Sequence, residues 1–317
     1  MNNPILEARG ISKSFGNIKA LDDVDFFLEK GIIHGLLGEN GAGKSSLMNI
    51  LSGIYIPEKG TLTINGQLVK RLNPDLASSY GIGMVHQEFR LIDSFSIKDN
   101  LTLSKSNIYQ NDFSEAFSKY SDIFALNLNA MTPVSELSVG EKQKVEIMKL
   151  IFHNSSIMLL NEPTAVLTPQ ETVQLKESLE TLSQEDEKTI VLITHKLKEI
   201  KDFTETIYVM KKGKMVAKDL DTKTVSDTQL IELMMGEVKT SKFDKNNFKG
   251  DNKLEAVNIS FTNEQNIKTL QNVSLEIKSG EVLGVAGVSG NGQVELANIL
   301  CGIIKDFDGQ VIVKTKD

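Results

Sequence analysis

Residues 38–46, GENGAGKSS, carry the clearest chemical signal in this sequence. Two glycines five positions apart, Gly38 and Gly43, are followed at once by Lys44 and Ser45. Glycines let backbone N–H groups close around phosphate oxygens, a lysine neutralises phosphate charge, and a serine hydroxyl can ligate Mg²⁺. The pattern predicts a phosphate cradle for ATP and Mg²⁺, which also contains the intervening residues and the next serine: Glu39, Asn40, Gly41, Ala42 and Ser46.

The flanking sequence predicts the elements that would hold this cradle. The apolar stretch IIHGLL comes directly before it, and KSSLMNILSGI continues with apolar residues at helical spacing. Strand, glycine loop and helix in this order form the context in which the motif binds phosphate. A glycine turn that only caps a helix is the alternative interpretation.

Polar residues follow further strand-like segments. The apolar runs SIMLL and TIVLIT predict buried parallel strands, the first leading into Asn161 and Glu162 and the second into His195. Gln87 follows a shorter segment, GMV. Sheets of α/β proteins place ligands at the carboxyl ends of their strands, where a carboxylate such as Glu162 can polarise a water. Taken singly, each of these residues is more often a solvated or packed side chain.

The stretch LSVGEKQKVEI, residues 137–147, contains a serine, a glycine and then an amphipathic pattern. By itself this pattern predicts a helix with Ser138 as its N-cap.

The end of the chain repeats its beginning. LEARGISKSFGNIKALDDV, residues 6–24, parallels LEAVNISFTNEQNIKTLQNV, residues 254–273, and later glycines keep register. In the second copy Gln293 and Val294 replace the lysine and the hydroxyl, and residues 262–265 contain no aromatic side chain. This copy should bind nucleotide poorly or bind it without turnover, because glutamine supplies no charge and valine cannot ligate Mg²⁺.

Composition limits the class of protein. The length of 317 residues argues for two domains, and a hydrophobic content of 40% is that of a globular protein. The net charge of −7 argues against a nucleic-acid binder. The sequence shows no run long and apolar enough for a membrane span, so we expect a cytoplasmic protein that meets the membrane through a partner. The single cysteine, Cys301, is expected to be a buried thiol.

The order of these motifs resembles that of the ATP-binding subunit of an ABC transporter. The resemblance covers residues 6 to about 238 and implies an α/β P-loop NTPase: a RecA-like core, an antiparallel β subdomain and a helical signature subdomain. It implies a first ABC domain at 1–239, a linker at 240–253 and the incomplete, degenerate start of a second ABC domain at 254–317. It also implies adenine stacking by Phe15, sensing of Mg²⁺ and γ-phosphate by Gln87, and γ-phosphate contact by Ser138 and Gly140 of the signature. Glu162 is implied as the general base, and His195 as the switch histidine that contacts the γ-phosphate.

The sequence departs from the family pattern at two places. The signature, usually LSGGQ, reads LSVGE here, although Ser138 and Gly140 remain. The aspartate that usually precedes the catalytic glutamate is Asn161. The resemblance implies Ser45, Gln87 and Asn161 as metal ligands, and an amide lacks the negative charge that helps to hold Mg²⁺. We therefore expect weakened Mg²⁺-dependent turnover; the alternative is that Ser45 and the phosphates hold the metal and the asparagine is tolerated.

A tandem ATPase with a degenerate second P-loop resembles the subfamily that powers import of simple sugars and nucleosides, and VHQEFRLIDSFSI is more like the nucleoside branch. The resemblance implies a peripheral position on the cytoplasmic face of the membrane, with transmembrane permease subunits that contact residues 87–99. It also implies an extracytoplasmic substrate-binding protein as an indirect partner, and a second ABC domain from the rest of the chain or from another copy. Two alternatives remain: a soluble tandem ABC protein acting on ribosomes or nucleic acid, and a truncated ATP-binding product with little turnover.

Overall fold

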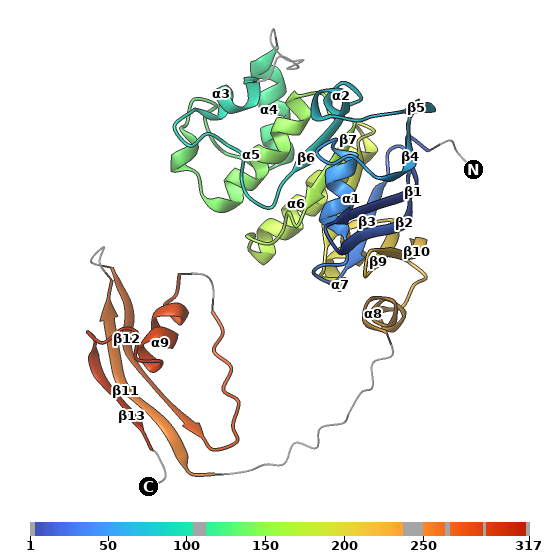
Figure 1. Cartoon of the computed structure of the whole chain (residues 1–317). Coiled ribbons are helices and arrows are strands. Elements are labelled where there is room, and N and C mark those ends of the chain that lie inside the picture. Colours follow the sequence, from blue (N-terminus) through green and yellow to red (C-terminus); the bar gives the residue numbers. More distant parts are fainter. Residues whose placement is uncertain (1–3, 104–111, 237–249, 264–266, 288–289, 315–317) are drawn as a thin grey trace. The chain divides into compact units, whose positions relative to one another are not determined.

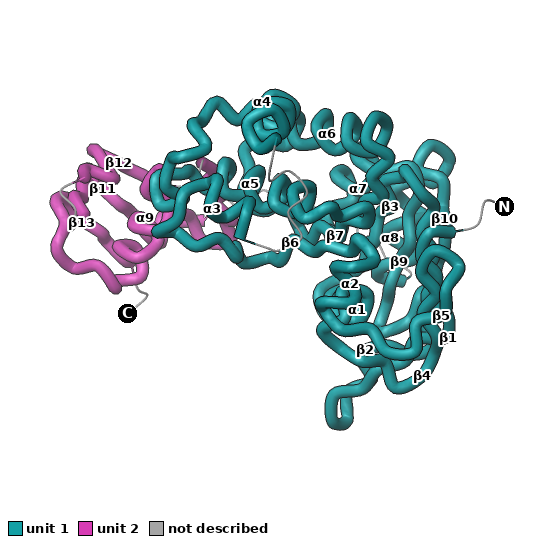
Figure 2. The backbone as a smooth tube through the Cα atoms, turned by 90° about the horizontal axis from the view of Figure 1, so that it is seen from above, with its two compact units in different colours: residues 1–239 teal, residues 240–317 magenta. Residues whose placement is uncertain are grey.

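The computed structural model describes residues 4–103, 112–236, 250–263, 267–287 and 290–314. The chain divides into two compact units, Met1–Lys239 and Thr240–Asp317 (Figures 1 and 2). Most of the predicted linker, residues 240–249, lies outside the described residues, and so do Glu264 and Gln265. The first strand of the second unit begins at Asn252, two residues before the predicted domain start at Leu254.

The first unit contains an antiparallel sheet with the strand order β2-β1-β4-β5. Its strands are β1 (Leu6–Phe15), β2 (Ile18–Leu28), β4 (Lys59–Ile64) and β5 (Gln67–Val69). Leu6, Ala8 and Ile11 of β1 are fully buried against the core, whereas Arg9 is exposed. This sheet is the expected antiparallel β subdomain.

A six-stranded sheet with the order β10-β9-β3-β8-β7-β6 carries the motifs. Its strands are β3 (Ile33–Gly38), β6 (Ile82–Val85), β7 (Ile157–Asn161), β8 (Thr189–Thr194), β9 (Thr206–Lys211) and β10 (Lys214–Asp221). All neighbours pair in parallel except β9 and β10. Strands β3 and β8 are buried at every residue, as expected for a parallel sheet covered on both faces.

Helices complete this unit (Figure 1). They are α1 (Lys44–Leu51), α2 (Pro74–Ser79), α6 (Pro169–Gln184), α7 (Leu197–Phe203) and α8 (Asp227–Met235), with α3 (Ile97–Thr102), α4 (Phe113–Ile123), a 3₁₀ turn (Val134–Glu136) and α5 (Val139–Phe152) between β6 and β7. The predicted N-cap of α5 is confirmed: the Glu141 N–H donates to Ser138 Oγ, and the Glu141 carboxylate accepts from the Ser138 N–H. Among the described residues, no helix combines the length and apolarity that a membrane crossing needs.

The second unit repeats the geometry of the first on a smaller scale. Strands β11 (Asn252–Thr262), β12 (Lys268–Lys278) and β13 (Asp308–Val313) pair in the order β12-β11-β13, the counterpart of β2-β1-β4. Helix α9 (Gln293–Leu300) corresponds to α1. Residues 281–287, the counterpart of β3, form no strand, and Val282 is 97% exposed because the described part of this unit supplies no strands like β8 and β9 to flank it.

The predicted burial of Cys301 is wrong. Its side chain is exposed, because Cys301 lies at the C-cap of α9 rather than on the face that buries Leu296 and Ile299.

Candidate nucleotide-binding site

The glycine loop turns sharply between β3 and α1. Gly41 and Gly43 adopt φ values of 80° and 104°, in the left-handed region that L side chains avoid. A Cβ on Gly43 would lie 2.5 Å from the backbone oxygen of Ala20. Only glycine therefore fits at this position. The tight turn lets the loop present its backbone N–H groups at the N-terminus of α1, where they can bind phosphate.

Lys44 is folded back over this loop. Its Nζ donates to the backbone oxygens of Gly38 at 2.6 Å and Glu39 at 2.9 Å, and the residue is only 7% exposed. Burial lowers the pKa of the Lys44 ammonium, and the carboxylates of Glu162 and Glu39 partly oppose this shift. The cation is thus held by the loop and faces the cavity that the loop borders.

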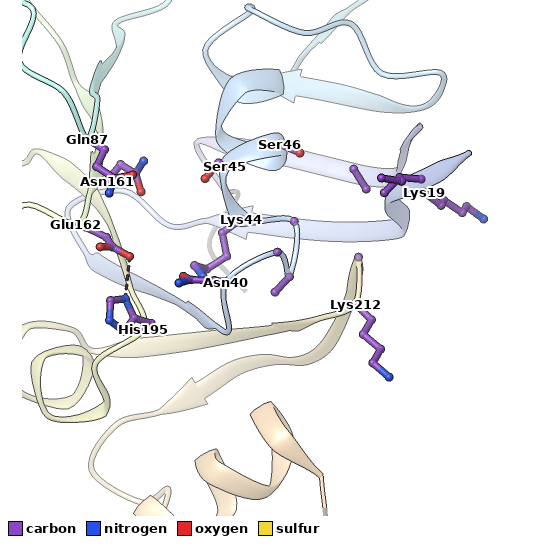
Figure 3. Close-up of a pocket in the computed structure, with 16 residues that line it drawn as sticks. Lys19, Asn40, Lys44, Ser45, Ser46, Gln87, Asn161, Glu162, His195 and Lys212 are labelled. Carbon is purple, nitrogen blue, oxygen red and sulfur yellow. Dashed lines mark hydrogen bonds and ion pairs between the residues drawn. The ribbon is translucent and has the colours of Figure 1, made fainter. Parts of the chain in front are cut away.

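A cavity of about 560 Å³ opens where the parallel strands end (Figure 3). It is bordered by the glycine loop and by the polar residues at the ends of three separate strands. Its lining consists of Ile18, Lys19, Ala20, Asn40, Gly41, Ala42, Gly43, Lys44, Ser45, Ser46, Gln87, Asn161, Glu162, His195, Lys212 and Gly213. Figure 3 shows Gln87, Asn161 and Glu162 on the side of the cavity that faces Ser45 and Lys44.

Glu162 and His195 form a pair at the ends of β7 and β8. His195 Nδ1 lies 2.8 Å from Glu162 Oε1, and the Glu162 side chain is 19% exposed. Glu162 adopts a φ of 50°, an uncommon backbone for a residue with a side chain. Its N–H donates to the oxygen of Ile193 at 2.9 Å, which fixes this conformation beside β8. Strained residues held in this way are frequent at functional sites.

Five predicted residues do not line this cavity. The Phe15 ring, 42% exposed, packs edge-on against Tyr55 with the ring centroids 5.2 Å apart. The Ser138 hydroxyl donates to Glu141 at 2.8 Å, outside the cavity. The remaining three are Gly38 and Glu39, which contribute backbone oxygens to Lys44, and Gly140.

Gly140 lies close to the end of the Glu171 side chain. A Cβ on Gly140 would lie 2.3 Å from Glu171 Oε1, and the Glu171 carboxylate is fixed by accepting from the N–H and hydroxyl of Thr168 at 2.8 Å each.

Sequence reasoning missed the lining residues contributed by the start of one strand and by one turn. Ile18, Lys19 and Ala20 come from the start of β2, and Lys212 and Gly213 from the turn between β9 and β10. The Gly213 N–H donates to the Ala42 oxygen at 3.0 Å, which holds this turn against the glycine loop. The dipeptide KG at 212–213 marks a turn, but no local signal places that turn at the cavity.

The donor set suits a phosphate ester and a hard cation. Lys44 and the loop N–H groups favour phosphate oxygens, while the oxygens of Ser45, Gln87, Asn161 and Glu162 are the kind that Mg²⁺ prefers. Fold and site together define a P-loop NTPase.

Comparisons with known proteins narrow this class. Residues 21–165 match the family described as ABC transporter. The nucleoside import ATP-binding protein NupA of Lactococcus lactis subsp. cremoris (strain MG1363) is 36% identical over 323 residues, covering 100% of this chain and 63% of NupA. The guanosine import ATP-binding protein NupO of Bacillus subtilis (strain 168) is 37% identical, covering 98% of this chain and 62% of NupO. The chain therefore spans less than two thirds of the length of these relatives.

Solved structures agree on the fold. The ADP conformation of an ATP-binding cassette of an ABC transporter superposes with a TM-score of 0.65 at 24% identity, covering 74% of this chain and 100% of that one. A dimeric cassette bound to ADP and Pi gives a TM-score of 0.60 at 25% identity, covering 68% of this chain and 98% of that one. The predicted ABC ATPase fold is confirmed for the first unit.

Proposed function

We propose that this chain is the ATP-hydrolysing, energy-coupling subunit of an importer for nucleosides or simple sugars, acting at the cytoplasmic face of the membrane. The observation that carries the proposal is the convergence of Lys44, Glu162 and His195 on one cavity. The names of relatives support the transport role, and they divide between nucleosides and sugars, since the glucose import ATP-binding protein TsgD13 of Haloferax volcanii is also 36% identical.

The residues that carry the proposal then have separate tasks. Lys44 and the loop N–H groups bind the phosphates, and Glu162 accepts a proton from the attacking water. His195, hydrogen-bonded to Glu162 at 2.8 Å, orients that carboxylate. Phe15 remains our candidate for adenine contact, with Tyr55 beside it.

Mg²⁺ would be held by Ser45, with Gln87 and Asn161 supplying amide oxygens nearby. When bound, the ion neutralises charge on the phosphate oxygens. The residues fit the ion in type, but Asn161 contributes no negative charge, so we propose a weaker metal site than a carboxylate would give.

The signature residues Ser138 and Gly140 lie outside this cavity. Their proposed contact with a γ-phosphate requires a second ABC domain, from the rest of a longer chain or from another copy. Residues 87–99 are the proposed contact for transmembrane permease subunits; Ile92 and Phe95 in this segment are each 38% exposed. A substrate-binding protein outside the membrane would select the nucleoside, the substrate class that we favour.

ATP hydrolysis by the full chain, with and without vesicles containing its permease, tests this function. Glu162→Gln should lower kcat by about 10²- to 10⁴-fold while ATP still binds. Glu187→Gln is the matched control, because Glu187 shares the φ of 50° but its side chain is 68% exposed and outside the cavity. Equal activity of the Glu162→Gln variant and the wild type would overturn the assignment, and stimulation by ribose rather than guanosine would overturn the nucleoside choice.

A further inference from the structure

Two side chains of helix α5 bind the backbone N–H and the backbone oxygen of Arg90. The Arg90 N–H donates to Glu146 Oε1, and Lys149 Nζ donates to the Arg90 oxygen at 3.0 Å. Arg90 follows Gln87, a cavity residue, by only three positions. The backbone that leads away from Gln87 is therefore attached to the helix that begins at Ser138.

Glu146 is unusually buried for a glutamate on a helix. It is only 4% exposed, and burial raises the pKa of its carboxyl, with Lys149 and the Arg90 N–H opposing that shift. A buried carboxylate costs free energy unless specific donors compensate for its lost hydration. Here the charges of Lys149 and Arg90 favour the carboxylate, which accepts a hydrogen bond from the backbone N–H of Arg90 in the segment after Gln87, so the side chain serves a particular contact rather than general packing.

Other contacts make the same segment rigid. Lys142, one turn before Glu146 on α5, forms an ion pair with Asp93 at 2.8 Å. The fully buried Asn100 accepts from the Ile92 N–H at 2.8 Å and donates to the Ile92 oxygen at 3.1 Å. Asn100 belongs to α3, so α5 holds this segment at Arg90 and Asp93, and α3 holds it at Ile92.

We propose that Glu146 is a positioning residue for Gln87: it couples the place of α5, and so of Ser138, to the place of Gln87 in the cavity. This inference rests on the proposed ATPase function. Eight residues of helix, about 12 Å, separate Ser138 from Glu146, so one rigid element connects the two sites. Contact between Ser138 and a second domain would reach Gln87 through this connection.

Amide hydrogen exchange of the full chain tests the connection without relying on catalysis. Glu146→Ala should accelerate exchange of the Arg90 amide by about tenfold or more, and Glu146→Gln, which keeps an acceptor oxygen, should restore much of the protection. Lys144→Gln is the control, because buried Lys144 lies on the same helix but contacts Gln174 at 3.3 Å instead. Unchanged Arg90 exchange in Glu146→Ala would overturn the proposal.

Steady-state kinetics test its consequence. Glu146→Ala should lower kcat by about 10- to 100-fold with little change in the KM for ATP, and the Gln variant should recover. In a Gln87→Ala background the same substitution should have little further effect, because it acts through Gln87. Equal losses in both backgrounds would refute the positioning role. A wild-type protein without ATPase activity would overturn the proposed function instead, and the exchange experiment would still decide on the connection.

Discussion

Two glycines of the phosphate loop offer a controlled test of what the loop requires. Gly41 and Gly43 both have left-handed φ values, 80° and 104°. A Cβ on Gly41 would meet no atom within 4 Å, whereas one on Gly43 would lie 2.5 Å from the Ala20 oxygen and 3.1 Å from Leu21 Cδ2. Alanine at the two positions thus separates backbone strain from steric exclusion.

The expected difference follows from these distances. Each alanine costs about 1–2 kcal/mol of left-handed strain and regains about 0.4–1 kcal/mol through the unfolded chain. Gly43→Ala adds a clash with backbone that cannot yield easily, because Ala20 lies in β2 and β2 is paired along β1. Overpacking of this kind costs about 1–3 kcal/mol, so Gly43→Ala should be less stable than Gly41→Ala by that amount.

Urea unfolding of the full chain, followed by circular dichroism, measures the difference, and ATP-dependent stabilisation measures binding. We expect Gly41→Ala to unfold near the wild type and Gly43→Ala at a clearly lower urea concentration. ATP should stabilise the Gly43→Ala variant less, because shifting the loop moves the N–H groups that face the phosphates. Equal midpoints for the two variants would show that steric exclusion by β2 is not the reason why position 43 requires glycine.

Three further predictions follow from the site and its support. Burial lowers the pKa of His34 from 6.5 to about 4, so below pH 6.5 the unfolded chain gains a proton that the folded chain does not. His34 alone should therefore lower the free energy of unfolding by about 3 kcal/mol between pH 7 and pH 4, so the total fall should be smaller by about this amount in His34→Gln, as urea titrations at each pH would show. Asn161→Asp should lower the Mg²⁺ concentration for half-maximal ATPase activity by about tenfold, and an unchanged requirement would contradict the weakened metal site. Glu162→Gly should be about 1 kcal/mol more stable than Glu162→Ala in thermal unfolding although neither hydrolyses ATP, because glycine relieves the left-handed strain; equal stability would refute that strain.

Local sequence signals predicted the elements that carry the site. The apolar runs at SIMLL and TIVLIT correspond to β7 and β8, and the glycine loop lies between β3 and α1 as predicted. These predictions succeed because burial on both faces of a parallel sheet demands continuous apolar residues. The Ser138 cap was predictable for a similar reason, since the capping box spans only four residues.

Features that depend on distant pairing could not be predicted. The cavity wall at Lys19 and Lys212 forms because the start of β2 and the turn between β9 and β10, far apart in sequence, both meet the glycine loop. The contact of Glu146 with Arg90 joins residues 56 positions apart, and its sequence context shows only an amphipathic helix. The left-handed backbone of Glu162 arises from its hydrogen bond to β8, which no local pattern encodes.

The second unit separates the parts of the motif that serve the fold from those that serve chemistry. Gly292 has a φ of 90° at the start of α9, and a Cβ there would lie 2.6 Å from the Thr269 oxygen, just as Gly43 meets Ala20. This glycine persists although Gln293 and Val294 have replaced the lysine and the hydroxyl. Because the steric demand comes from the neighbouring strand, it survives the loss of the groups that bind phosphate and Mg²⁺. Glycine at this spacing therefore indicates close packing of the helix start against the neighbouring strand, and the case for ATP hydrolysis by the first unit depends on Lys44 and Ser45.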